Sequence, residues 1–233
     1  MSGAGVVGRD RELAAVAAFL DAVRSGPCGL VLEGVAGIGK TTVWSAGVAL
    51  AAGRSYTVLP ARPAESEATL SFAALGDLLD GVLDRALPEL PPPQRRALEV
   101  ALLRADPGGS PPEQRAVAVA FLGVIRHLAA AGPVVVAVED LQWLDAPSAR
   151  VVEFALRRLG QERAGLLASV RDEGDGRAVS AAGTGLPAGR LSRVRVGPLA
   201  LGAFESAVRA AAGSRLSRLT VRRLFDASGG NPF

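Results

Sequence analysis

The chain of 233 residues is long enough for one α/β domain with a small appendage, and its 49% content of apolar residues excludes global disorder. The net charge of only +3 predicts no strong field for nucleic acid, and the single cysteine, Cys28, excludes an internal disulfide framework. No segment has the ~18 to 20 uninterrupted apolar residues of a membrane span, and the N-terminus lacks a secretory signal pattern, so we expect a soluble, cytoplasmic protein.

The first sixty residues alternate between helical and strand patterns. The expected elements, in chain order, are a helix over 9–24, a buried strand at 30–32, a glycine-rich turn over 34–39, a helix to about residue 52, and a strand at 56–59 that Pro60 ends. Residues 62–132 carry no strong strand signal. Their apolar spacing predicts helices over 72–83, 94–103 and 114–131, so we interpret this stretch as a helical insertion.

In the second half of the chain, strand and helix patterns alternate again. The expected elements are strands at 134–138, 166–170 and 191–196, and helices over 147–159, 203–212 and 216–227. Asp145 precedes Ala146-Pro147-Ser148, which is typical of a helix N-cap. This alternation predicts an α/β fold, with a mostly parallel sheet of about five strands and helices on both faces. We place a boundary near Pro198, between a sheet domain over 1–198 and a C-terminal helical piece over 199–233.

One segment fits the phosphate-binding pattern G-x-x-x-x-G-K-[ST]. It consists of Gly34, Val35, Ala36, Gly37, Ile38, Gly39, Lys40 and Thr41. Glycines let successive backbone N–H groups point at phosphate oxygens, and the following helix adds its positive N-terminal end. Lys40 can reach the outer phosphates, the Thr41 hydroxyl can bind Mg²⁺, and Thr42 continues the cradle. Lys40 is also the one lysine among 26 Lys and Arg residues, which indicates a place where arginine does not substitute.

A pair of carboxylates follows the clearest strand. Glu139 and Asp140 come directly after Val134–Val138, where P-loop proteins place the acidic residues of the metal site. One carboxylate can hold Mg²⁺ and the other can orient or deprotonate the attacking water, and the sequence leaves open which does which. Arg171 ends another strand and is a candidate for contact with the γ-phosphate.

Four segments together resemble the STAND-type, AAA+-like signalling ATPases. They are Val7-Gly8-Arg9-Asp10-Arg11-Glu12-Leu13, the P-loop, Val138-Glu139-Asp140-Leu141-Gln142-Trp143-Leu144-Asp145, and Gly229-Gly230-Asn231-Pro232-Phe233. The order is most similar to the nucleotide-binding module of large ATP-binding LuxR-type transcriptional regulators. The resemblance implies a three-layer P-loop NTPase core with a small C-terminal helical lid, and ATP or ADP with Mg²⁺ as ligands.

The resemblance also implies roles for single residues. Val7, Gly8 and Arg9 match the segment that lies along adenine and ribose. Arg171 matches a sensor arginine, and Pro232 matches the proline that packs on adenine from the lid. Glu139 departs from the aspartate that is frequent at the first acidic position. Such regulators continue into further helical domains and a DNA-binding helix-turn-helix, so we expect this chain to be an N-terminal fragment with the lid cut short.

These features predict an ATP/ADP switch with slow ATPase activity, nucleotide as its partner, and self-association in the ATP state. DNA binding is expected only through downstream domains of a parent regulator, and no contact with a membrane is expected. Two alternatives stay open: a nucleotide-binding scaffold that does not hydrolyse, and an origin-recognition-like DNA-binding ATPase, which the arginines between Arg190 and Arg223 suggest.

Overall fold

The structure, a computed structural model, describes residues 6–109, 112–172, 185–186, 189–212 and 216–232. Five strands form one sheet in the order β2-β3-β4-β1-β5, and every pairing between neighbours is parallel. The strands are β1 (Cys28–Gly34), β2 (Thr57–Ala61), β3 (Val134–Val138), β4 (Ala164–Arg171) and β5 (Leu191–Arg195). The predicted parallel sheet of about five strands is confirmed.

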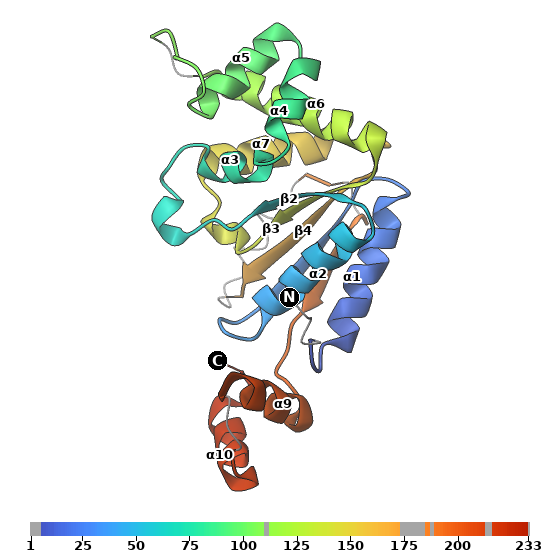
Figure 1. Ribbon diagram of the computed structural model, residues 1–233, viewed down its shortest axis with the longest axis vertical. Coiled ribbons are helices and arrows are strands. Elements are labelled where there is room, and N and C mark those ends of the chain that lie inside the picture. Colours follow the sequence, from blue (N-terminus) through green and yellow to red (C-terminus); the bar gives the residue numbers. More distant parts are fainter. Residues whose placement is uncertain (1–5, 110–111, 173–184, 187–188, 213–215, 233) are drawn as a thin grey trace.

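Helices cover both faces of the sheet, which gives the predicted three layers (Figure 1). One face carries α1 (Asp10–Val23) and α2 (Lys40–Gly53), and the other carries α3 (Ala73–Leu79), α6 (Gln114–Ala131) and α7 (Ala146–Arg158). Strand β3 shows why both faces need cover. Val135 and Ala137 lie in the core with α1 and α2, whereas Val134, Val136 and Val138 lie in the opposite core.

The segment between β2 and β3 contains helices and, among its described residues, no strand. Its remaining elements are the short 3-10 helices η1 (Glu65–Glu67) and η2 (Leu87–Glu89) and the helices α4 (Leu83–Ala86) and α5 (Pro92–Ala101); a further 3-10 helix, η3 (Leu141–Trp143), follows β3. The single helix expected over 72–83 is wrong. It breaks after α3 because Gly81 adopts a positive φ of 73°, a conformation that ends a helix.

Strand β2 also differs from the prediction, because it continues through Pro60 to Ala61. Proline is tolerated here since β2 is an edge strand that pairs only with β3, where Pro60 lies opposite Ala137. The extension matters for the site. It carries the chain to Ala61, whose carbonyl accepts a hydrogen bond from the Glu139 N–H at 3.0 Å.

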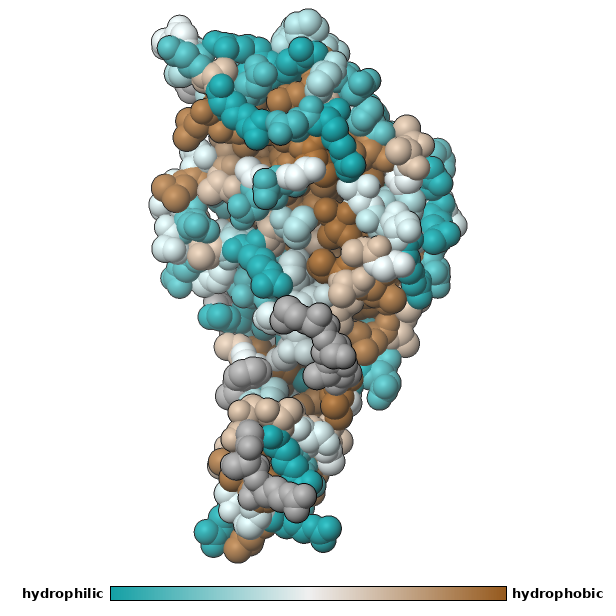
Figure 2. All heavy atoms as spheres, viewed as in Figure 1, coloured by the Kyte–Doolittle hydropathy of each residue, from teal (hydrophilic) through white to brown (hydrophobic). Residues whose placement is uncertain are grey.

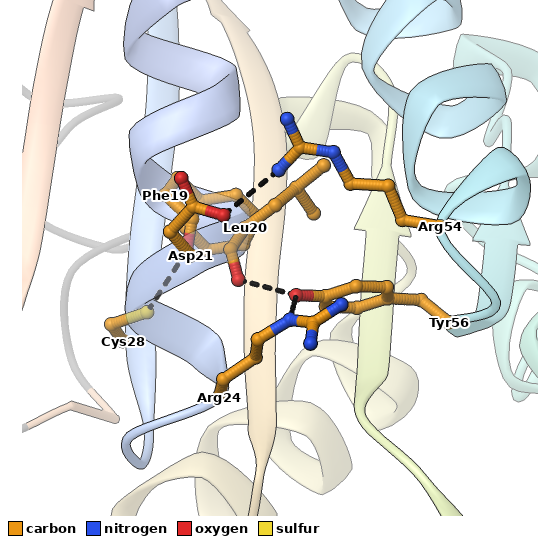
Figure 3. A network of polar contacts seen from close by, with 7 residues as sticks. All are labelled: Phe19, Leu20, Asp21, Arg24, Cys28, Arg54 and Tyr56. Atoms are coloured by element: carbon orange, nitrogen blue, oxygen red, sulfur yellow. Dashed lines mark hydrogen bonds and ion pairs between the residues drawn. The ribbon is translucent and has the colours of Figure 1, made fainter.

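Polar contacts fix α1 to the start of β2, as Figure 3 shows. The Tyr56 hydroxyl donates to the Leu20 carbonyl at 2.6 Å and accepts from Arg24 Nε at 3.0 Å. Arg54 forms an ion pair with Asp21 at 2.9 Å. These groups lie where the strands begin, so they support the sheet without entering the edge at which β1 and β3 end.

The C-terminal helices α9 (Leu201–Ala212) and α10 (Arg218–Ser228) have a small core of their own. Its buried residues are Leu199, Phe204 and Val221, and the rings of Phe204 and Phe225 meet edge to face with centroids 5.4 Å apart. Figures 1 and 2 show this unit as a narrow projection below the sheet domain.

One helix among the described residues, α6, is long and apolar enough to cross a membrane by length and composition. Half of that window is buried inside the protein, where Phe121 and Ile125 are fully covered. A buried core helix passes the same test, so α6 is weak support for a membrane segment.

Candidate functional site

The ends of three strands meet at one edge of the sheet. In the register of β1 and β4, Gly34 lies opposite Arg171, and in that of β3 and β4, Val138 lies opposite Ala168. The P-loop after β1, the carboxylates after β3 and the arginine that ends β4 therefore share the carboxyl edge. This is the edge at which open α/β sheets bind ligands.

The P-loop has the backbone that the glycine pattern predicts. Gly37 and Gly39 have positive φ angles of 75° and 102°, which favour glycine over any residue with a Cβ. Lys40 begins α2, and no side chain of the described residues caps that helix. The first N–H groups of α2 are thus available to an anion, together with the positive end of the helix dipole. Thr41 and Thr42 are exposed in its first turn.

Lys40 lies near three of the predicted charged groups, Glu139, Asp140 and Arg171. The residue is buried at 7% exposure, and its Nζ donates to the carbonyl oxygens of Gly34 and Val35, each at 3.0 Å. Burial lowers the pKa of Lys40, the nearby Arg171 lowers it further, and the negative charges of Asp140 and Glu139 oppose that shift. The structure therefore brings the ammonium group, the two carboxylates and the guanidinium into one electrostatic neighbourhood.

The two carboxylates have different surroundings. Glu139 is buried at 8% exposure and pairs with Arg62, with 3.3 Å between Oε2 and Nε. Asp140 adopts a left-handed conformation with φ 48°, and its N–H donates to Ser169 Oγ at 2.9 Å. Such a conformation is uncommon for a residue other than glycine, and the Ser169 hydrogen bond helps to hold it.

Gln142 joins Asp140 to the end of β4. Its Nε2 donates to Asp140 Oδ1 at 3.2 Å, and its Oε1 accepts from the Arg171 N–H at 3.2 Å. Both ends of the amide are used, which fixes its orientation. The Nε of Arg171 is buried and has no hydrogen-bond partner among the described residues. A buried, unpaired guanidinium donor is costly, and an anionic ligand at this edge would supply the acceptor.

The N-terminal segment reaches the P-loop through Arg9. Arg9 is only 4% exposed; its Nη2 donates to the Ile38 carbonyl, and its Nη1 donates to the Gly197 carbonyl at 2.6 Å and to Glu12 at 3.1 Å. Gly8 has a φ of 71°, and a Cβ there would stand 2.3 Å from that of Ala203 in α9. Val7 is 48% exposed. Arg9 thus links the start of the chain, the P-loop and the segment before α9.

The C-terminal motif also reaches the P-loop. Asn231 Nδ2 donates to the Ala36 carbonyl at 3.1 Å, and the Leu199 N–H donates to the Gly230 carbonyl at 2.9 Å. Pro232 follows and is half-buried, while Phe233 lies outside the described residues. The two motifs at opposite ends of the sequence therefore contact the same loop.

The residues present fit a magnesium ion that phosphate oxygens help to hold. The Thr41 hydroxyl and the carboxylates of Glu139 and Asp140 are the hard oxygen donors that Mg²⁺ prefers. No group of three or more His, Cys, Asp or Glu side chains suited to a metal occurs in the part of the chain that the structure describes. Phosphate or water oxygens would complete the coordination of an ion held by these three side chains.

Sequence reasoning missed Ser169 and Arg62. The sequence contains a signal for Ser169, because its hydroxyl interrupts an otherwise apolar run. In the structure Ser169 is 1% exposed. Arg62 follows the edge strand and gave no local signal, since its partner Glu139 is far along the chain. Asp145, interpreted from sequence as an N-cap, is one: it accepts from the Ser148 N–H at 2.9 Å.

Comparisons with known proteins agree on the fold. A family model described as the AAA ATPase domain matches residues 5–169, and no curated protein matches the chain. The chain is similar to a signal transduction ATPase with numerous domains (STAND) that has a tetratricopeptide repeat sensor, from Pyrococcus horikoshii, with 17% identity, a TM-score of 0.50, and coverage of 100% of this chain and 29% of that one.

Two replication proteins of Aeropyrum pernix are also similar. ORC1 in complex with DNA has 16% identity and a TM-score of 0.52, covering 91% of this chain and 50% of that chain. ORC2 in ADPNP-ADP complexes has 17% identity and a TM-score of 0.54, and the match covers 91% of this chain and 54% of ORC2. At these identities the likeness concerns the fold alone, and the chain spans about half or less of each of these proteins.

Proposed function

The chain belongs to the AAA ATPase domain family, and on that premise we propose that it is an ATP-binding signalling switch with slow, Mg²⁺-dependent hydrolysis of ATP to ADP and phosphate. One observation carries the proposal: a buried lysine, two carboxylates and an arginine with an unpaired donor converge on an uncapped helix N-terminus. That combination suits a triphosphate, because each group offers what phosphate oxygens or their metal require.

In this proposal each residue of the site has a role in binding the phosphates, the metal or the attacking water. The amides from Gly34 to Thr42 and the Lys40 ammonium bind the phosphates, and Arg171 contacts the outer phosphate with its unpaired donor. Bound Mg²⁺ would neutralise phosphate charge at Thr41 and Glu139. Asp140 then orients the attacking water, because its carboxylate is held by a neutral amide and lies in the field of Lys40. This proposal gives the metal to Glu139 and the water to Asp140, a choice that the sequence leaves open.

The C-terminal helices serve in this proposal as a lid over a core made by residues 1–198. Asn231 and Arg9 support the assignment, since both donate to carbonyl groups of the P-loop. Val7, Gly8 and Arg9 on one side and Pro232 on the other would enclose adenine. ADP would hold residues 199–233 against the core, and ATP with Mg²⁺ would favour an open form that associates with other copies.

We further propose that the module belongs to a LuxR-type transcriptional regulator. The order of the four motifs supports this. DNA binding would reside in other domains of such a regulator, and the module would work in the cytoplasm.

A binding titration tests the proposal. Lys40→Ala should weaken Mg-ATP binding by about 2 to 4 kcal/mol, or roughly 30- to 900-fold, because a charge-assisted contact to phosphate is lost. Arg54→Ala is the matched control, since it removes a cation just after the far end of α2, where it pairs with Asp21. Equal affinity of the Lys40→Ala variant and the parent protein would refute nucleotide binding at this loop.

A second candidate is a nucleotide-binding scaffold without turnover. The ion pair of Glu139 with Arg62 favours it, because that pairing withdraws a carboxylate from the metal. Single-turnover hydrolysis separates the two: release of phosphate from bound ATP over hours supports the switch, and full retention of ATP supports the scaffold.

A further inference from the structure

Arg62 occupies a junction between the site and the insertion. It follows β2 directly, and its Nε lies 3.3 Å from Glu139 Oε2. Its Nη2 donates to Ser45 Oγ at 3.1 Å, and its guanidinium lies 5.1 Å from the centre of the Trp44 ring. The side chain is nevertheless 62% exposed, so it can move without disturbing the core.

The partner of Arg62 is a buried carboxylate that a metal would also need. The Glu139 side chain is 11% exposed, and Arg62 is the cation that pairs with it among the described residues. A buried carboxylate needs a positive partner, and a guanidinium and a divalent cation compete for its charge. Binding of Mg²⁺ at Glu139 therefore displaces Arg62 or shares the carboxylate with it.

A second acceptor lies within the reach of Arg62. A cavity of 480 Å³ is lined by Arg62 together with Asp77 and Asp80 from α3 and its C-terminal end. No ion pair joins either aspartate to a cation within the described parts of the chain. Burial and the negative charges of Glu67 and Asp80 raise the pKa of Asp77. Asp77 and Asp80 thus have no ion-pair partner among the described residues, and Arg62 lines the same cavity.

We propose that Arg62 exchanges between two acceptors, pairing with Glu139 in the metal-free protein and with Asp77 and Asp80 when a divalent cation on bound nucleotide takes Glu139. Arg62 is then a positioning residue of the metal site, and its movement reports the state of that site to the insertion. This inference rests on the proposed nucleotide binding at the P-loop.

A double-mutant cycle tests the exchange through binding alone. The dissociation constant of the imido analogue of ATP is measured with EDTA and with Mg²⁺, and the ratio of the two gives the enhancement by metal. Asp77→Asn with Asp80→Asn should reduce this enhancement about threefold, because displaced Arg62 loses its second acceptor. The same pair of changes in an Arg62→Gln background should leave the ratio unchanged.

Arg126→Gln is the matched control, because Arg126 forms a comparable half-exposed pair with Glu162 at 2.8 Å. It should leave the enhancement unchanged. An equal effect of the aspartate changes in both backgrounds, or no effect in either, would overturn the exchange. A parent protein that binds no nucleotide even with Mg²⁺ would instead overturn the proposed function itself, so the two failures are distinguishable.

Trp44 supplies a second readout. In a Trp143→Phe background Trp44 is the remaining tryptophan, and departure of the Arg62 guanidinium from its ring should change its emission when Mg²⁺ is added to the nucleotide complex. Arg62→Gln should abolish the change. Emission that responds identically with and without Arg62 would contradict the movement.

Discussion

Asp145 holds the insertion to the sheet domain, and its replacement gives the most quantitative prediction. Asp145 is 1% exposed, and its carboxylate accepts hydrogen bonds from three backbone N–H groups: those of Ser148 at 2.9 Å, Phe72 at 2.9 Å and Ala74 at 3.1 Å. The hydrogen bond from Ser148 caps α7, and those from Phe72 and Ala74 fix the start of α3. One side chain therefore joins the helix after β3 to the helix after β2.

Asp145→Ala leaves all three donors without their acceptor. Loss of a helix cap costs ~1 kcal/mol, and each of the two other buried donors costs roughly 1 to 2 kcal/mol when its charged acceptor is removed. We expect a loss of about 3 to 5 kcal/mol in the free energy of unfolding. This is a large share of the ~5 to 15 kcal/mol that keeps a domain folded.

Urea unfolding followed by circular dichroism measures the change. At a denaturant sensitivity of about 3 kcal/mol per molar, the midpoint should fall by about 1 to 2 M. Asp145→Asn is the matched control: its one acceptor oxygen can still serve Ser148 and Phe72, so about 1 to 2 kcal/mol should be lost, mainly at Ala74. If the alanine variant loses less than ~1 kcal/mol, the three hydrogen bonds do not stabilise the protein as argued.

Three further predictions concern the site, the C-terminal helices and the thiol. Gln142→Leu should slow single-turnover hydrolysis about tenfold while nucleotide affinity stays within about twofold, because Gln142 positions Asp140 and does not bind phosphate; loss of affinity would contradict this role. Gly8→Ala should speed amide hydrogen exchange in α9 by about tenfold, since the added Cβ would stand 2.3 Å from the Cβ of Ala203 and strain a φ of 71°; unchanged exchange would refute it. Burial raises the pKa of Cys28 to about 11. Because this pKa lies above the ordinary value of 9.0, the contribution of the buried neutral thiol to the free energy of unfolding is present below pH 9 and is lost as pH rises toward 11. The rate at which the Cys28 thiol reacts with a disulfide reagent should rise about tenfold per pH unit between pH 8 and 10. A rate that levels off near pH 9 would show an unshifted thiol.

Residues that are close along the chain are enough to predict several parts of this protein. The glycine spacing before Lys40 predicts the turn in which Gly37 and Gly39 have positive φ, and the apolar run of Val134–Val138 predicts a strand buried on both faces. Asp145 before a proline set a helix start. Each of these follows from backbone freedom, side-chain alternation or capping within a few residues, so it can be read without knowing what lies across the fold.

The set of distant groups that share the site depends on how the whole chain packs. Asn231 contacts the carbonyl of Ala36 across 195 residues, and Arg62 meets Glu139 because β2 lies beside β3 at the edge of the sheet. Ser169 holds Asp140 for the same reason, as β4 is the neighbour of β3, and Gln142 accepts from the Arg171 N–H across the same two strands. Such contacts depend on strand order and register, which the packing of the whole chain sets and no local pattern encodes.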